Sequence, residues 1–146
     1  MKLLQKTYSI QIPKAHFDGV LSLLNKHAHL VIAVILSCIS IYYFNTYLQN
    51  NLGLAYNDAR SHLDIGRRVV EGLKPGLAQL GSVWLPLNHI LMVPLIWHDW
   101  MWHSGFAGAI QSMIGFVASG LVIYYIMKEL RVGMLGRLVG VAVFAA

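Results

Sequence analysis

The apolar residues of this chain fall into long runs without acidic or basic side chains. Residues 27–57, 75–98 and 100–127 contain no Asp, Glu, Lys or Arg. A helix that crosses the hydrocarbon core of a bilayer needs about 20 consecutive, mostly apolar residues. Each run can therefore contain one membrane-spanning helix, and the pattern predicts an all-α, polytopic transmembrane helical bundle.

The same pattern divides the chain into predicted spans and connecting segments. The spans cover, in chain order, residues 29–48, 80–98, 105–127 and, as the start of a truncated fourth span, 138–146. The connecting segments are an N-terminal cytoplasmic segment, a first loop, a short loop and a basic loop, which cover residues 1–28, 49–79, 99–104 and 128–137. Pro86 and Pro94 interrupt the second span, so that span is expected to be kinked.

The first loop concentrates charge and predicts an amphipathic helix over residues 58–73. Its apolar face follows helical spacing and consists of Ala59, Leu63, Gly66, Val70 and Leu73. Its charged face offers three oppositely charged pairs with a spacing of four residues: Arg60 with Asp64, Asp64 with Arg68, and Arg67 with Glu71. Such a helix is expected along the membrane surface or against the bundle.

Asp58 differs from the other charged residues of this loop, because His62 and not a Lys or Arg stands four positions after it. Asn57 or Asp58 could simply cap the helix. Alternatively, Asp58 could accept a proton or bind a hydroxyl group, with His62 on the same face to orient it. His89 lies inside the predicted second span and is a further candidate for a site, although it could equally be hydrogen-bonded within the bundle.

Composition and charge agree with a multi-pass protein of the cell membrane. The chain is 57% hydrophobic and 12% charged, whereas soluble domains carry about 25% charged residues. Its net charge of +5 suits contact with anionic lipid headgroups. The sequence has no basic stripe interleaved with aromatic residues, so nucleic acid is not expected as a partner.

Charge counting leaves the orientation open. If residues 80–98 cross the membrane, the positive-inside rule favours an external N-terminus; if they re-enter on the same side, it favours an internal one. The segment "WHDWMWH" at residues 97–103 offers His98, Asp99 and His103, but its three tryptophans are more typical of an interfacial belt. We therefore predict neither a metal nor a cofactor.

Two stretches, "NDARSHLDIGRRVVEG" at residues 57–72 and "GLAQLGSVWLPLNHILMVPLIW" at residues 76–97, follow an N-terminal span. This layout resembles the start of the GT-C class of membrane glycosyltransferases, which includes protein mannosyltransferases and aminoarabinose transferases. The resemblance covers residues 30 to about 130. It implies a polytopic helical enzyme that moves a sugar from a polyprenyl-phosphate donor to an acceptor hydroxyl or amine at the extracytoplasmic face.

The resemblance also implies roles for particular residues. Asp58 matches the acid of the first extracytoplasmic loop, which serves as base or acceptor ligand, and His62 and His89 are further substrate-binding candidates. The chain departs from the family pattern, because Asn57 and Ala59 flank Asp58 where many members have a second acid. Many members also have a Lys before the proline that opens the second span, whereas this chain has Val83, Trp84 and Leu85 before Pro86. The candidates for binding the donor phosphate are therefore Arg60, Arg67 and Arg68.

Two other classes of protein remain open from the sequence. A non-enzymatic membrane subunit or scaffold could use the loop helix as a docking face and the predicted third span for helix packing. That span contains small-residue pairs four apart, namely Gly105 with Ala109, Gly108 with Ser112, and Gly115 with Ser119. A haem or metal protein could instead use His89 and His98.

Overall fold

The computed structural model describes residues 14–80, 84 and 86–146, and every regular element in this part of the chain is a helix. The prediction of an all-α fold is thereby confirmed for these residues. The elements are α1 (Lys14–Gln49), α2 (Asn57–Arg68), the 3-10 helix η1 (Leu77–Leu80), α3 (Leu87–Ile96), α4 (Asp99–His103), α5 (Phe106–Glu129) and α6 (Met134–Ala145).

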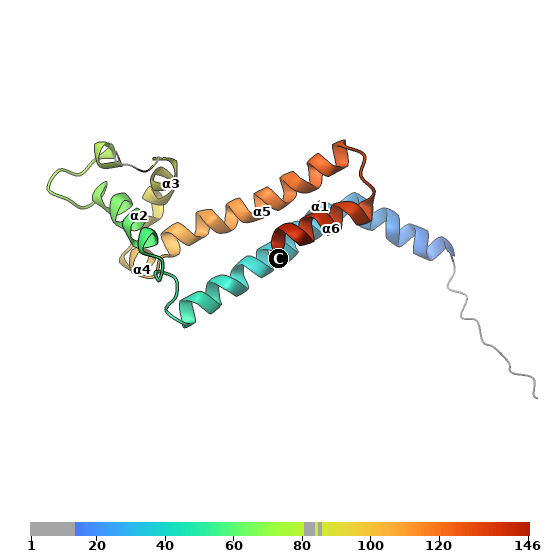
Figure 1. The fold of residues 1–146 in the computed structure, drawn as a ribbon, viewed down its shortest axis with the longest axis horizontal. Coiled ribbons are helices and arrows are strands. Elements are labelled where there is room, and N and C mark those ends of the chain that lie inside the picture. The colour runs from blue at the N-terminus through green and yellow to red at the C-terminus, as the bar shows by residue number, and fades with distance from the viewer. Residues whose placement is uncertain (1–13, 81–83, 85) are drawn as a thin grey trace, which may run out of the picture.

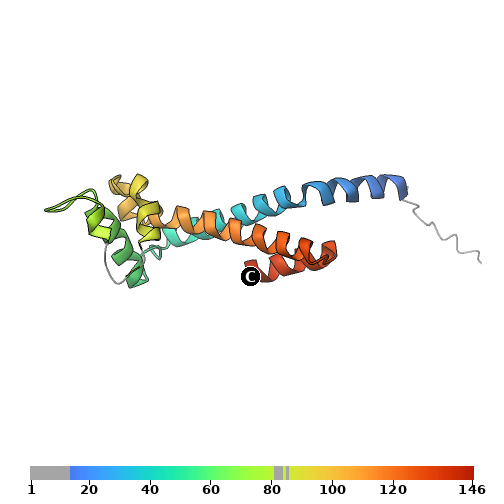
Figure 2. The ribbon, with the colours of Figure 1, turned by 90° about the horizontal axis from the view of Figure 1, so that it is seen from above.

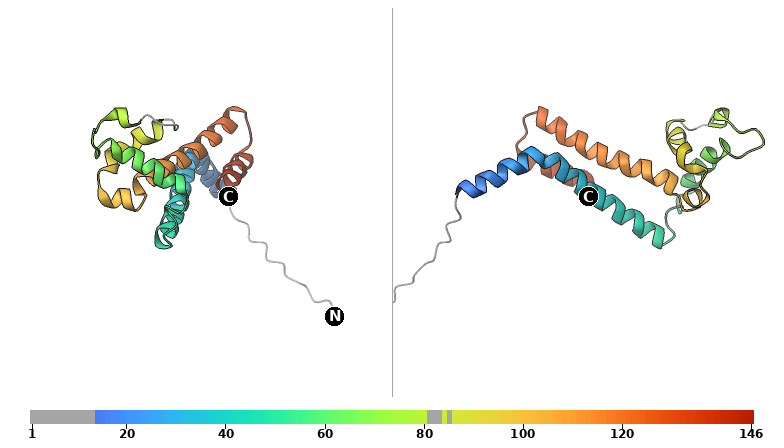
Figure 3. Two further views of the ribbon diagram at one scale, coloured as in Figure 1. Left: turned by 60° about the vertical axis from the view of Figure 1, so that its left-hand side comes forward. Right: turned by 180° about the vertical axis from the view of Figure 1, so that it is seen from behind.

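Two long helices define the shape of the molecule (Figure 1). Helices α1 and α5 run antiparallel side by side, while α2, α3 and α4 gather at one end of the pair (Figures 1 and 2). We call this group of three helices the head. Helix α6 begins at the opposite end and turns back along the pair (Figure 3).

Within the described residues, two helices are long and apolar enough to cross a membrane. They are Asn25–Gln49 within α1 and Phe106–Glu129, which is α5, and they cover the spans predicted at residues 29–48 and 105–127. A helix of 24 residues is about 36 Å long, which exceeds the roughly 30 Å of a bilayer's hydrocarbon core. Most of their apolar side chains are exposed or half-buried, such as Val34 (62% exposed) and Ile114 (65% exposed).

The second predicted span, residues 80–98, contains a much shorter helix. Residues 81–83 and 85 lie outside the described residues, and α3 covers only ten residues after Pro86. Ten residues of α-helix measure about 15 Å, or half the thickness of the hydrocarbon core. Helix α3 instead packs against α2 and α5 as part of the head.

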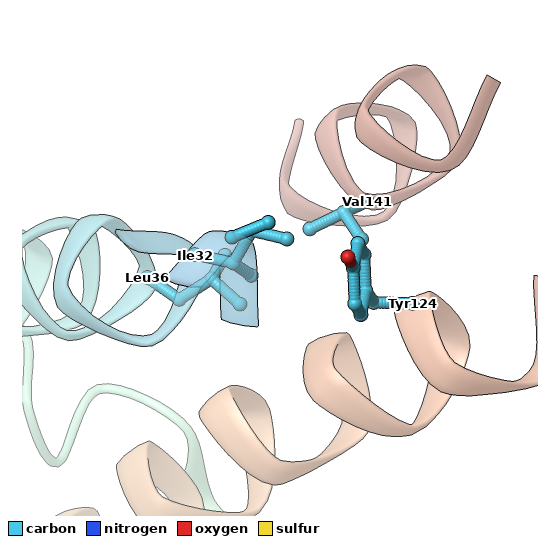
Figure 4. Close-up of a cluster of buried hydrophobic side chains, with 5 residues drawn as sticks. Ile32, Leu36, Tyr124 and Val141 are labelled. Atoms are coloured by element: carbon cyan, nitrogen blue, oxygen red, sulfur yellow. The ribbon is translucent and has the colours of Figure 1, made fainter. Parts of the chain in front are cut away.

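A small cluster joins α1, α5 and α6 (Figure 4). It consists of Ala28, Ile32, Leu36, Tyr124 and Val141. Helix α5 approaches α1 at Gly120, where an added Cβ would collide with the Cδ1 atom of Leu36. Of the small residues predicted to allow close packing, Gly115 instead faces open space. The close approach therefore depends on a glycine that the four-residue spacing did not identify.

A second cluster holds the head on the first turn of α5. Leu63 of α2, Met92 and Ile96 of α3, and Ala107 of α5 are each less than 5% exposed. Gly66 of α2 faces the same cluster, and an added Cβ there would lie 3.5 Å from Ile96, an ordinary van der Waals distance. The head is thus fixed relative to α5 by buried side chains from three helices.

Candidate functional site

Helix α2 carries most of the candidate residues, and it is shorter than the sequence predicted. It begins at Asn57 and ends at Arg68, whereas residues 58–73 were expected. The first part of the predicted apolar face is covered, with Leu63 and Gly66 buried. Val70 is 39% exposed and Leu73 is fully exposed, because the chain has left the helix before it reaches them.

Arg67 is buried and clamps α2 to the segment that joins α3 to α4. Its guanidinium donates to Glu71 at 2.6 and 2.8 Å, to Asp99 at 2.6 Å, and to the carbonyl oxygen of Ile96 at 2.8 Å. The hydrogen bond to Glu71, more than the one to Asp99, raises the pKa of Arg67, although burial opposes the rise. Its donors are committed to these protein partners, which leaves Arg67 poorly placed to hold a donor phosphate.

Arg60 and Asp64 also form the ion pair that their spacing predicts, at 3.1 Å. Trp102 of α4 covers this pair: its indole N–H donates to Asp64 at 3.1 Å, and the Arg60 guanidinium lies 4.4 Å from the ring centroid. The sequence indicated an interfacial tryptophan belt here and did not reveal this contact, because it joins residues 38 positions apart.

Arg68 is exposed and forms no ion pair with any other residue that the structure describes. The predicted pairing of Asp64 with Arg68 is therefore not formed, since Asp64 bonds Arg60 and Trp102 instead. Of the three arginines considered for a phosphate, Arg68 is the one whose guanidinium is available.

Asp58 lies in the first turn of α2 and is half-buried. No side-chain hydrogen bond caps this helix at Tyr56, the residue before Asn57. The Tyr56 hydroxyl donates to the Oδ2 atom of Asp58 at 2.7 Å, and this bond raises the pKa of Tyr56. The Oδ1 atom accepts no hydrogen bond from the residues that the structure describes, so one carboxylate oxygen can receive a proton.

His62 and His89 meet between α2 and α3. The Nδ1 atom of His62 lies 2.8 Å from the Nε2 atom of His89, and Trp84 packs on the His62 ring at a centroid distance of 4.8 Å. His89 is fully buried, and burial, followed by the electrostatic effect of His62 beside it, lowers the pKa of His89. The structure thus brings together two candidates that are 27 positions apart in the sequence.

A polar cavity of about 270 Å³ lies between the head and the start of α5. Its polar lining comes from His62, Asn88, Gln111 and Ser112. The Oε1 atom of Gln111 is buried and has no hydrogen-bond partner among the described residues. Because a buried acceptor without a donor costs about 1–3 kcal/mol, this oxygen favours a ligand that supplies an O–H or N–H group. Sequence reasoning had not identified Asn88, Gln111 or Ser112 as site residues.

Within the described residues, no three His, Cys, Asp or Glu side chains come close enough together to hold a metal ion. His98 and Asp99 lie at the start of α4, where Asp99 pairs with Arg67, and His103 is exposed. His89 pairs with His62, not with His98. The arrangement offers acid–base and hydrogen-bonding groups.

Comparison of the chain with protein-family models, with curated protein sequences and with solved structures finds no match.

Proposed function

We propose that this protein is a membrane glycosyltransferase that moves a sugar from a polyprenyl-phosphate donor to an acceptor hydroxyl or amine. The observation that carries the proposal is Asp58. It is a half-buried carboxylate in the first turn of a head helix, with one oxygen bonded by Tyr56 and the other available. An acid in this layout is what the resemblance to GT-C enzymes requires.

In the proposed reaction, Asp58 takes the proton from the acceptor as the acceptor atom attacks the anomeric carbon of the sugar. The bond between that carbon and the phosphate oxygen breaks, and the carrier phosphate leaves with the electron pair. Tyr56 holds one carboxylate oxygen, so the other can point to the acceptor. Arg68 is the arginine of α2 with a free guanidinium, and a cation stabilises charge that develops on a leaving phosphate.

The proposal places α1 and α5 across the cell membrane with the head on the extracytoplasmic side. In this arrangement the end of the molecule opposite the head carries Lys26, Lys128, Arg131 and Arg137. Lys14 at the start of α1 is a fifth basic residue at that end, whereas the head side carries four, namely Arg60, Arg67, Arg68 and Lys74. An excess of Lys and Arg marks the cytoplasmic side, which supports this orientation.

The proposal is tested by replacing Asp58 with Asn in cell membranes that contain the full protein. The assay follows radiolabelled sugar from a polyprenyl-phosphate hexose into membrane lipids and proteins. Loss of a general base costs about 10²–10⁴-fold in rate, so Asp58→Asn should reduce transfer by at least 100-fold. Asp64→Asn is the matched control and should retain most of the transfer, because Arg60 and Trp102 are the partners of Asp64 among the described residues.

Full transfer by Asp58→Asn would refute the role of Asp58. If the unaltered protein transfers no sugar from such donors, the alternative of a non-enzymatic membrane subunit gains support. The outward-facing apolar surfaces of α1 and α5 are compatible with packing against another membrane helix as well as against lipid.

A further inference from the structure

The polar cavity lies next to an apolar groove, and two residues belong to both. Ala109 and Ser112 of α5 line the cavity and also line a groove of about 310 Å³ between α1 and α5. The groove continues over Tyr43 and Phe44 of α1 and Phe116 of α5. The polar cavity and the apolar groove are therefore adjacent along α5.

The cavity is polar without being charged. The described residues that line it include His62, Asn88, Gln111 and Ser112, but no Lys, Arg, Asp or Glu. A phosphate placed there would lack the cation that a buried anion requires. A hydroxyl group, in contrast, both donates and accepts hydrogen bonds, and it could donate to the Oε1 atom of Gln111, which lacks a partner.

The lining of the groove indicates the chemistry of the part of the ligand that lies outside the cavity. Its lining is almost entirely apolar and aromatic, and it lies between the two helices that are long and apolar enough to cross a membrane. Along α5, the groove residue Phe116 lies further from the head than the cavity residue Gln111. A chain that leaves the cavity through Ser112 would thus run toward the hydrocarbon core.

From this adjacency we infer that the cavity and groove together bind a neutral, hydroxyl-bearing lipid, with its headgroup at Gln111 and its acyl chain against Phe44 and Phe116. Binding of such a lipid does not depend on the proposed function. Its assignment as the sugar acceptor rests on the proposed function. The acceptor hydroxyl and the donor phosphate then occupy different places, because the free guanidinium of Arg68 is not part of the cavity lining.

The test uses the full protein in phosphatidylcholine nanodiscs and a monoacylglycerol with a diazirine in its acyl chain. Light should attach the probe to residues 43–47 and 112–116. An excess of unlabelled monoacylglycerol should remove this labelling, whereas the same concentration of free glycerol should not, which separates a lipid headgroup from a soluble polyol. Lysophosphatidic acid with the same diazirine chain should label these residues at least 10-fold less.

Gln111→Leu should lower the labelling by about 10-fold. It should not destabilise the protein, since it removes a buried acceptor that has no partner, and thermal unfolding checks this. Gln79→Leu is the matched control, because Gln79 lies in η1 and bonds the carbonyl of Lys74. Equal labelling by the phosphate probe, labelling spread evenly over α1, α5 and α6, or undiminished labelling of Gln111→Leu would overturn the inference. These outcomes require no sugar transfer, so they are independent of the Asp58 test.

Discussion

At the scale of single residues, the same side-chain type has different roles along α2. Arg67 is 7% exposed and its donors reach two carboxylates and a carbonyl, while Arg68 next to it is exposed. Sequence spacing identified both as candidate ligands and correctly paired Arg67 with Glu71. Sequence spacing could not distinguish the roles of Arg67 and Arg68, because the burial of Arg67 depends on contacts with Ile96 of α3 and Asp99 of α4.

The two arginines should therefore differ in their effect on stability. Arg67→Met leaves Glu71, Asp99 and the carbonyl of Ile96 without their donor, and we expect a loss of about 2–3 kcal/mol in the free energy of unfolding. Arg68→Met should change it by less than about 0.5 kcal/mol. Denaturation of both variants in detergent measures this difference. Equal losses of stability would contradict the role of Arg67 in holding α2 against α3 and α4.

His89 should make the head sensitive to acid. Its folded pKa lies below the ordinary value of 6.5, because of burial and then the electrostatic effect of the neighbouring His62. As pH falls through about 6.5, the unfolded chain takes up a proton that the folded protein does not. Stability conferred by neutral His89 is therefore fully present above this pH and decreases below it.

Thermal unfolding between pH 7.5 and pH 5 measures this effect. The unaltered protein should lose more stability over that range than His89→Asn, whose side chain does not titrate. His103→Asn alters an exposed histidine and should follow the unaltered protein. A pH dependence that is the same in His89→Asn would show that another group is responsible.

At the scale of elements, close helix packing is decided by one glycine. Gly120 and Gly115 both lie in α5, yet an added Cβ meets Leu36 at the first and open space at the second. The four-residue spacing of small residues predicted a packing face without showing which positions touch α1. The rotation of α5 about its axis is fixed by Tyr124 and Val141 in the cluster with Leu36.

Substitution by alanine should affect stability differently at Gly120 and Gly115. Gly120→Ala overpacks the contact with Leu36, and we expect a loss of about 1–3 kcal/mol in stability. Gly115→Ala adds a methyl group in open space and should be neutral or stabilise by up to about 1 kcal/mol, because alanine favours the helix. Unfolding in detergent distinguishes them, and a neutral Gly120→Ala would exclude a close α1–α5 approach.

At the scale of the whole molecule, the length of α3 affects the proposed topology. With only α1 and α5 crossing the membrane, the N-terminal side of α1 and the α5–α6 turn share one face, and the head lies on the other (Figure 1). Charge counting over three full spans had favoured the reverse orientation. The ten-residue α3 is too short to serve as a third full span, so that count does not apply to the proposed topology.

Cysteine labelling in intact cells tests this topology. In a Cys38→Ala background, Leu73→Cys places a thiol on a fully exposed loop of the head, and Glu129→Cys places one at the end of α5. A membrane-impermeant maleimide should label residue 73 in intact cells and residue 129 only after permeabilisation. The reverse pattern would contradict the orientation, and labelling of both in intact cells would contradict two spans.

The sequence by itself determined the all-helical fold of the described residues, the positions of the two long apolar helices and the Arg60–Asp64 and Arg67–Glu71 pairs. These features follow from apolar run length and from helical spacing, both of which are local. Only the tertiary structure decided the meeting of His62 with His89, the contact of Trp102 with α2, and the position of the polar cavity beside an apolar groove. These features require residues far apart in sequence to meet, and that depends on how α3 and α4 fold against α2 and α5.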